Sequence, residues 1–394
     1  MLDTICTFPL PADLFAQALH PSEPILTVGL SSGHVYTYRL PSLGDEGGES
    51  AADNVVKQIH THEQSLLPAP IISSLRRSSI ASENGLGSIA EMWKTRRHKG
   101  SCRALAFSHD GNVAYSAGTD GLVKAFDTAS GKVTWKSALG DGDDAPSAMH
   151  VLSPQALVLG TDDGKMYVYD VREQAARPSH EWAPHGREPV NGITPIPASA
   201  ASTSGFPKQW VSVGGATLAV TDIRKGVLAT SDDQEIELTK CVMLQGLKRG
   251  GTSVGEKVAV AQADGVISLW ERGVWGDLDE RIVVDRGAGG AGEGIDSLCE
   301  APPGFRCREG GGGGRDHLVR MDEKILAIGL ASGQIRFARI GRNRVFETWD
   351  LVHDELDGVA ALGEDDNSSR RKKRKRNKGK DRSGGIALNL SGVF

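Results

Sequence analysis

The most distinctive chemistry in this sequence belongs to a block of cations near its C-terminus. The block comprises Arg370, Arg371, Lys372, Lys373, Arg374, Lys375, Arg376, Lys378 and Lys380. Guanidinium and ammonium groups at this density repel one another, which keeps a segment extended, and such a block serves nuclear localisation or binds phosphate backbones. The block contains no aromatic residue, so we expect any contact with RNA to be sensitive to salt and independent of base sequence.

Three further residues have side chains that bind metal ions. Cys299, Cys307 and His317 lie near one another in the chain, but no Cys-x-x-Cys pair accompanies them, and the five cysteines of the chain are scattered. This spacing is more typical of free thiols in a reducing compartment than of a zinc site or a disulfide framework. We therefore expect no metal and no cofactor.

The sequence lacks two common motifs of enzyme chemistry. It contains no HExxH and no GxxxxGK[ST] motif. The glycine run at 310–314 has neither the lysine nor the strand–helix context of a phosphate-binding loop. No convergent set of titratable groups emerges from the pattern, so we expect a protein that is not an enzyme.

The composition favours a chain of many short strands. Its 394 residues include 49 glycines and only 5% aromatic residues, which suits tight turns better than long helices. No secretory signal is present, and no apolar run reaches the roughly 20 residues of a membrane helix, so we expect a soluble intracellular protein. Residues 370–382 contribute +9 to a net charge of −5, which leaves −14 for the rest, a layout typical of partner binding.

One hairpin pattern recurs along the chain and predicts the strands that make up its fold. VAYSAGTDGLVKAFD at 113–127 and KVAVAQADGVISLWE at 257–271 each consist of two apolar strands around a turn that contains glycine. Glycine can adopt a positive φ in such a turn without a Cβ clash. Similar hairpins occupy 25–40, 156–170, 210–224 and 325–340.

A second apolar strand precedes most of these hairpins, for example at 102–108, 147–153 and 239–245. A unit of several strands that repeats at about 45 residues is typical of a β-propeller, in which each blade is a small antiparallel sheet. Both faces of a blade pack on its neighbours, so its strands should be apolar on both sides. The alternative is a β-sandwich of repeated hairpins, but a sandwich does not require a fixed period.

Hairpins that end in an aromatic residue and an acid resemble WD repeats. In that family a loop His, a strand Ser or Thr, a turn Asp and a strand Trp form a hydrogen-bonded set that locks each blade. The second copy matches best through His98, Ser116 and Asp120, with Phe126 in the Trp position, and its set should be incomplete because Phe has no ring N–H. The corresponding structural positions in other copies are Asp163, Tyr169, Asp264 and Trp270.

Two Asp-x-Arg units follow such hairpins. Asp170 and Arg172 form one unit, and Asp222 and Arg224 form the other. They resemble the WDxR box by which some WD propellers dock onto the adaptor of a cullin-RING ubiquitin ligase, although both units lack the Trp. The alternative is that each Arg pairs with nearby acids on the rim of the propeller.

The whole layout resembles a narrower group. A degenerate WD propeller, the phrase HDELDGVAALG at 353–363 and the basic C-terminus are together similar to the WD repeat-containing protein fifty-five family, including its fungal Jip-type members. That resemblance implies a nucleolar protein of ribosome biogenesis and ribosomal RNA processing.

The boundaries of the predicted fold follow from the repeats. We expect an all-β, WD-repeat β-propeller over residues 1–362, with a disordered insertion at about 41–90, and a disordered basic tail over 363–394. Within the insertion's blade, the outer strand should resume near Trp93. Six repeats are recognisable, and the strand at 357–363 indicates a seventh, incomplete blade. Residues 4–10 could close the ring as the outer strand of that last blade.

The function that these observations favour is that of a non-enzymatic scaffold. The resemblance implies a role in pre-ribosomal RNA processing and large-subunit assembly in the nucleolus, with pre-ribosomal assembly factors as partners and with non-specific RNA contact through the tail. We expect a monomer within a larger complex and no membrane contact. The alternatives are a substrate receptor for a cullin-RING ubiquitin ligase and a generic nuclear or chromatin-associated propeller.

Overall fold

The structure is a computed structural model. It describes residues 10–40, 79–81, 88–140, 144–173, 177–199, 202–247, 255–285, 287, 292–301, 306–308, 316–318, 324–333, 335–340 and 346–350. The basic tail, the predicted strand at 357–363 and the predicted closing segment at 4–10, except for its last residue, lie outside these ranges.

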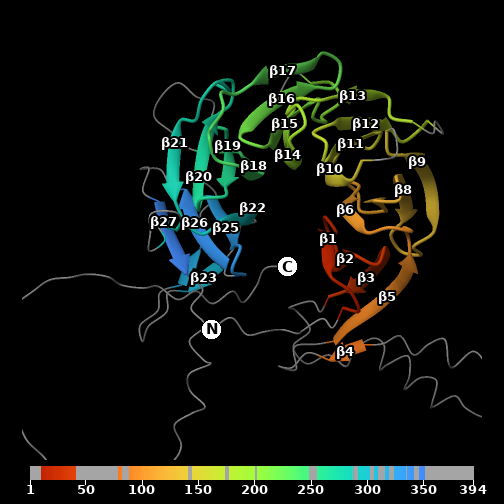
Figure 1. Cartoon of the computed structure of the whole chain (residues 1–394). Helices are drawn as coiled ribbons and strands as arrows, with labels where there is room; N and C mark the ends of the chain where they lie inside the picture. Colours follow the sequence, from red (N-terminus) through yellow and green to blue (C-terminus); the bar gives the residue numbers. More distant parts are fainter. Residues whose placement is uncertain are drawn as a thin grey trace, which may run out of the picture.

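The described residues form a β-propeller of six blades arranged around a central axis, with each blade following the last in chain order (Figure 1). This confirms the predicted all-β propeller. Each blade is a four-stranded antiparallel sheet whose first strand lies nearest the axis, and blade one carries a short additional strand. Blade one consists of β1 (Leu14–Leu19), β2 (Ile25–Leu30), β3 (His34–Arg39), β5 (Ser88–Arg96) and the additional β4 (Ser79–Ala81).

The strands of the next three blades follow the same order. Blade two comprises β6 (Cys102–Phe107), β7 (Val113–Gly118), β8 (Leu122–Asp127) and β9 (Val133–Ala138). Blade three comprises β10 (Pro146–Ser153), β11 (Ala156–Thr161), β12 (Met166–Asp170) and β13 (His180–Trp182). Blade four comprises β14 (Val190–Ile196), β15 (Gln209–Gly214), β16 (Thr217–Asp222) and β17 (Gly226–Thr230).

The last two blades contain the longer inserts. Blade five comprises β18 (Leu238–Leu244), β19 (Lys257–Gln262), β20 (Val266–Glu271) and β21 (Glu280–Val283). Blade six comprises β22 (Ile295–Glu300), β25 (Lys324–Leu330), β26 (Ile335–Ile340) and β27 (Phe346–Asp350). A separate hairpin of β23 (Arg306–Arg308) and β24 (Asp316–Leu318) lies between its first two strands in the chain.

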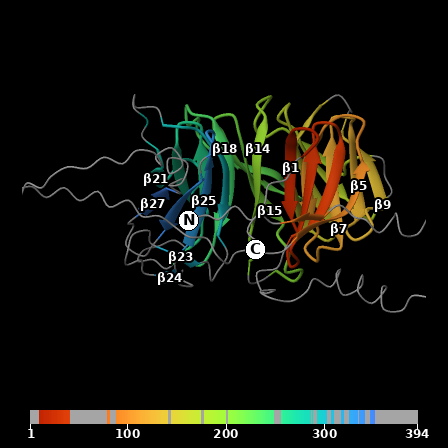
Figure 2. The same ribbon diagram turned by 90° about the horizontal axis from the view of Figure 1, so that it is seen from below.

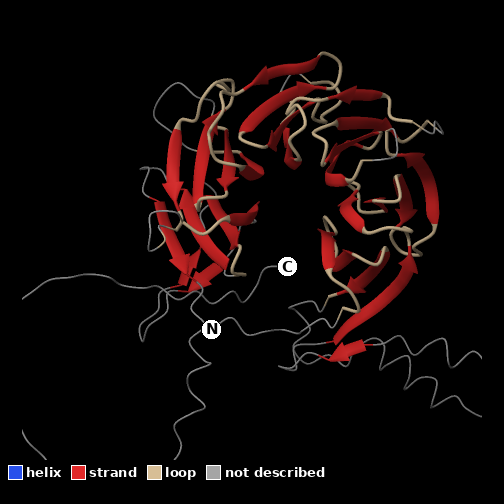
Figure 3. Cartoon of the chain, viewed as in Figure 1, coloured by secondary structure: helices blue, strands red, loops and turns tan. Residues whose placement is uncertain are grey.

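The strands run from one face of the ring to the other, so the connecting loops collect on two faces (Figure 2). We call one the glycine-turn face; it carries the turns between the second and third strands and the links from one blade to the next. The other, which we call the groove face, carries the loops between the first and second strands and between the third and fourth. The described residues contain strands and loops without a helix (Figure 3), and therefore no helix that could cross a bilayer.

Blade one differs from the prediction at two places. Its innermost strand, β1, is not among the predicted strands, and its residues are all exposed or half-buried. Its outer strand, β5, includes Trp93 as expected, but it begins at Ser88, inside the span assigned to the insertion, and pairs with β4. The described blades leave one sector of the ring open, between blade one and blade six (Figure 1).

The blades pack through apolar residues on both faces of each sheet, as predicted. In β11 and β19 every residue after the first is buried. One core cluster joins blade two to blade three through Tyr115, Leu139 and Val151. Another joins blade four to blade five and includes Trp270, which is fully buried. Since burial of apolar area is the main stabilising term, each blade depends on its neighbours.

The turn glycines are required where two backbones approach closely. Gly164 has a φ of +77°, and a Cβ at this residue would lie 2.7 Å from the carbonyl oxygen of Glu188 and 2.8 Å from that of Gly186. Both oxygens belong to the segment that links blade three to blade four. Gly265 repeats the arrangement in blade five, with a φ of +80° and 2.8 Å to the carbonyl oxygen of Glu293.

Replacing Gly164 by alanine should therefore destabilise the fold more than the same change at Gly186. Gly186 has a φ of +68° but nothing within 4 Å of its Cβ position, so Gly186→Ala adds only the strain of a left-handed backbone, about 1–2 kcal/mol. Gly164→Ala must also displace two carbonyl oxygens, and we expect a further loss of at least about 1 kcal/mol in the free energy of unfolding. Urea titration of both variants measures the difference, and equal losses would show that close approach does not matter here.

Candidate functional site

The predicted set in blade two lies together in the structure. The Nδ1 of His98 is 2.7 Å from a carboxylate oxygen of Asp120, and its Nε2 is 2.9 Å from the hydroxyl of Ser116. A carboxylate only accepts, so Nδ1 carries the proton and the Ser116 hydroxyl donates to Nε2. Burial lowers the pKa of His98, although Asp120 favours the protonated ring. The ring is fully buried, and the set fixes the link between blades one and two.

Phe126 occupies the Trp position and is completely buried. Its ring and that of Trp93 form a T-shaped pair with centroids 5.4 Å apart, and the guanidinium of Arg97 lies 4.2 Å from the Phe126 centroid. The Trp93 indole N–H donates to the carbonyl oxygen of Thr128 at 2.8 Å. A neighbouring indole from blade one thus supplies the ring N–H that Phe126 lacks, but it does so toward the backbone instead of the Ser116 hydroxyl.

Blade four contains an equivalent set that was not predicted from the sequence repeats. The Nδ1 of His185 is 2.9 Å from the Thr217 hydroxyl, which donates to the carbonyl of Gly214, and Nε2 is 2.9 Å from the Ser212 hydroxyl. Thr217 makes the contact that Asp120 makes in blade two, but it is the first residue of the third strand, so the sequence pattern indicates only the histidine. Burial lowers the pKa of His185 to about 4.

The remaining repeat positions take part in simpler contacts. The Tyr169 hydroxyl donates to the carbonyl of Ala138 at 3.1 Å, and the Trp270 indole donates to the hydroxyl of Ser268 at 3.0 Å. Asp264 accepts the amide of Val266 at 3.2 Å within its own turn. Asp163 is exposed, and its backbone amide donates to the carboxylate of Asp144, so it does not take the place that Asp120 has in blade two.

The backbone places the two cysteines and the histidine considered as metal ligands on two separate sheets. Cys307 and His317 are register partners in the β23–β24 hairpin, whereas Cys299 lies in β22. Within the described ranges no three His, Cys, Asp or Glu side chains are grouped so that they could hold a metal ion.

The two Asp-x-Arg units end the third strands of blades three and four, and both lie on the groove face. Arg172 pairs with Asp170 through its Nε at 2.9 Å and its terminal nitrogen at 2.5 Å. This pairing lowers the pKa of Asp170. The Asp222 carboxylate instead accepts the backbone amide of Arg224 at 2.9 Å, that of Lys225, and the side-chain amide of Gln209. The first unit therefore shows the local pairing considered as an alternative, and the second does not.

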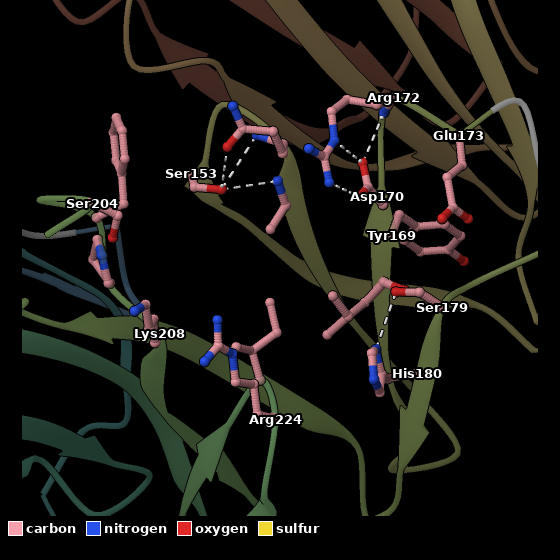
Figure 4. Close-up of a pocket in the computed structure, with 16 residues that line it drawn as sticks. Ser153, Tyr169, Asp170, Arg172, Glu173, Ser179, His180, Ser204, Lys208 and Arg224 are labelled. Atoms are coloured by element: carbon pink, nitrogen blue, oxygen red, sulfur yellow. Dashed lines mark hydrogen bonds and ion pairs between the residues drawn. The ribbon is translucent and has the colours of Figure 1, made fainter. Parts of the chain in front are cut away.

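Both arginines line one groove between blades three and four, with a volume of about 440 Å³ (Figure 4). Its floor lies where the apolar interface of the two blades reaches the surface, at Ala156, Val168 and Ile223. The remaining side chains that matter for its chemistry are Asp170, Glu173, His180, Phe206 and Lys208. The pattern of the sequence could not show that the two units meet, because they come from different blades.

Comparison with known proteins places the chain in a family. It is 48% identical over 376 residues to the WD repeat-containing protein JIP5 of Phaeosphaeria nodorum, covering 93% of this chain and 78% of the relative. It is also 48% identical over 373 residues to jip5 of Emericella nidulans, covering 93% and 81%. The chain belongs to the JIP5 family of WD repeat-containing proteins. The JIP5 protein of Coccidioides immitis is 42% identical over 376 residues, covering 93% of this chain and 77% of its own length. No protein-family model matches the chain.

The buried histidine of blade four should make this JIP5-family propeller sensitive to acid. The pKa of His185 is about 4 in the folded chain and near 6.5 when unfolded, so the unfolded chain binds the proton first as the pH falls. The stability that the neutral ring contributes is full above pH 6.5 and is lost as the pH falls toward 4. Between pH 7.5 and pH 5 we expect a loss of about 2 kcal/mol from this residue.

Urea titrations of the parent and of His185→Gln at both pH values measure this loss. Glutamine can still contact Ser212 and Thr217 but does not titrate, so the variant should lose about 2 kcal/mol less than the parent over that interval. The matched control is His180→Gln, which alters an exposed histidine of the neighbouring strand. If the two variants and the parent show the same pH dependence, His185 is not the sensitive group.

Proposed function

We propose that this chain is a non-enzymatic scaffold of ribosome biogenesis that acts in pre-ribosomal RNA processing and large-subunit assembly in the nucleolus. The observation that carries the scaffold role is the burial of both faces of the blades, which leaves two loop faces of a rigid ring for partners. The ribosomal role is supported by the resemblance of HDELDGVAALG and of the basic C-terminus to the WD repeat-containing protein fifty-five family.

In this proposal the basic block directs the protein to the nucleolus. Residues 370–382 carry +9 while the rest of the chain carries −14, so attraction to nucleic acid is concentrated in one segment. Contacts between these cations and RNA phosphates would be independent of sequence and would weaken steeply as salt rises. The ring would then be held near ribosomal RNA while its loops bind assembly factors, with the chain as a monomer in the larger complex.

A second candidate is a substrate receptor of a cullin-RING ubiquitin ligase. The observation that favours it is that Arg172 and Arg224, from the two Asp-x-Arg units, line the same groove on one face. Two arginines that line the same groove could both contact the ligase adaptor, whereas a single Asp-x-Arg unit would supply only one arginine.

Deletion of residues 370–382 should abolish nucleolar accumulation while leaving the ring folded, because the deleted cations lie beyond the last described strand. Imaging of the fluorescently tagged parent and deletion variant in cells measures localisation, and thermal unfolding of both purified chains controls for folding. Undiminished nucleolar signal in the deletion variant would contradict the role of the tail. A variant with the same lysines and arginines in shuffled order should remain nucleolar, since charge density carries the effect.

Affinity purification with mass spectrometry separates the two candidate functions. We expect large-subunit assembly factors to be enriched with the parent, which is compared with a double variant in which Arg172 and Arg224 are both changed to glutamate. Capture of a cullin-RING adaptor that is lost in this double variant would instead support the ligase candidate. Absence of assembly factors from the parent's partners would overturn the ribosomal proposal.

A further inference from the structure

The groove between blades three and four combines an apolar floor with cations on its rim. Ala156, Val168 and Ile223 form the floor and belong to the core cluster that joins the two blades. The volume of about 440 Å³ is within the range of about 300–1,000 Å³ that ligand sites occupy in proteins. Arg172 and Arg224 lie on different walls of this hollow (Figure 4).

The two walls differ in the charge that they leave available. On the wall from blade three, Arg172 is paired with Asp170, and Glu173 lies beside it, so these three side chains leave no cation available to a ligand. On the wall from blade four, Arg224 and Lys208 are exposed, and the nearby Asp222 carboxylate accepts backbone and side-chain amides instead of pairing with either cation. The side chains of Arg224 and Lys208 make no ion pair within the described ranges. The groove therefore attracts negative charge mainly through blade four.

The groove continues toward blade five. A second hollow of about 400 Å³ shares Phe206 and Lys208 with the first and reaches Pro197 and Arg272. Arg272 is already paired with Glu256, so it adds little free charge. Phe206 is half-buried between the two hollows, and its ring meets the edge of His109 with centroids 5.2 Å apart. An extended chain could follow this path, with apolar surface beneath it and Lys208 beside it.

From this arrangement we propose that the groove binds an extended acidic peptide segment of a partner protein. An apolar side chain of the segment enters the hollow above Ile223, and flanking carboxylates pair with Arg224 and Lys208. The planar guanidinium of Arg224 can bind a carboxylate through two parallel hydrogen bonds. This inference deepens the proposed scaffold role by naming the chemistry of one partner.

An acidic peptide fits the groove better than RNA does. Three cations and two carboxylates line it, so it lacks the dense positive charge that binding to a phosphate backbone requires. Its apolar floor suits an aliphatic or aromatic side chain, and exclusion of water there strengthens the flanking ion pairs. Single-stranded RNA would need exposed aromatic rings for stacking, and Phe206 is already half-buried against His109.

Fluorescence anisotropy with the purified full chain tests the proposal. The probe is a short fluorescent peptide of glutamates around one central phenylalanine, and its partner probe has glutamine in place of glutamate. The key variant is Arg224→Glu, and the matched control is Lys225→Glu, which makes the same charge reversal at the next residue, outside the groove. The chain lacking 370–382 is measured beside them because a segment with a charge of +9 would itself attract an anionic probe.

We expect the tail-deleted chain to bind the acidic probe, and Arg224→Glu to weaken binding at least tenfold, as loss of a charge-assisted pair predicts. Lys225→Glu should change it less than about twofold, and the glutamine probe should bind at least about tenfold more weakly. Neither variant should alter thermal unfolding, since both side chains are exposed.

Three results would overturn the proposal: equal weakening by Arg224→Glu and Lys225→Glu, no binding once the tail is removed, or tighter binding of a single-stranded RNA oligomer that depends on Arg224. Each uses purified chain and leaves the nucleolar proposal standing. Conversely, loss of the assembly factors in cells would not affect peptide binding.

Discussion

Each sheet of this ring is apolar on both faces, and the rest of the structure depends on that constraint. A sheet of this kind can hide its two faces only between two neighbours, which is why the same four-stranded unit follows itself around an axis. The same constraint leaves few strand side chains available for binding, since most of them pack between blades. Polar chemistry is left to the loops on the two faces, where blades can differ without disturbing the core.

Buried hydrogen bonds fix how neighbouring segments are positioned, which apolar packing alone does not. His98 and His185 each connect the segment that enters a blade to the second strand of that blade and to the residues that follow it, through partners at 2.7–2.9 Å. Apolar contacts alone would allow small shifts between sheets, whereas a buried ring with both nitrogens bonded has one position that satisfies it. Thr217 and Asp120 show that different side chains can complete the set, because either can accept a hydrogen bond from the Nδ1–H group.

The sequence allowed the propeller to be predicted because its signals are local. The hairpins around Gly121 and Gly164, the apolar pattern of their strands and the set at His98 lie within single repeats. Features that need two distant segments were missed or left open. The strand Leu14–Leu19 is recognisable only from its pairing with β2, and Thr217 replaces the expected aspartate beside His185. The meeting of Arg172 and Arg224 depends on how blade three packs on blade four.

We propose that the rigid ring binds its partner through the groove face, where exposed cations border an apolar floor. The most direct measurement is lysine cross-linking with mass spectrometry on the complex purified from cells. Lys208 and Lys225 lie on the groove face, whereas Lys99 and Lys165 lie on the glycine-turn face. We expect the partner protein to cross-link to Lys208 and Lys225. A partner that cross-links to Lys99 and Lys165 while leaving the groove face unmodified would contradict it.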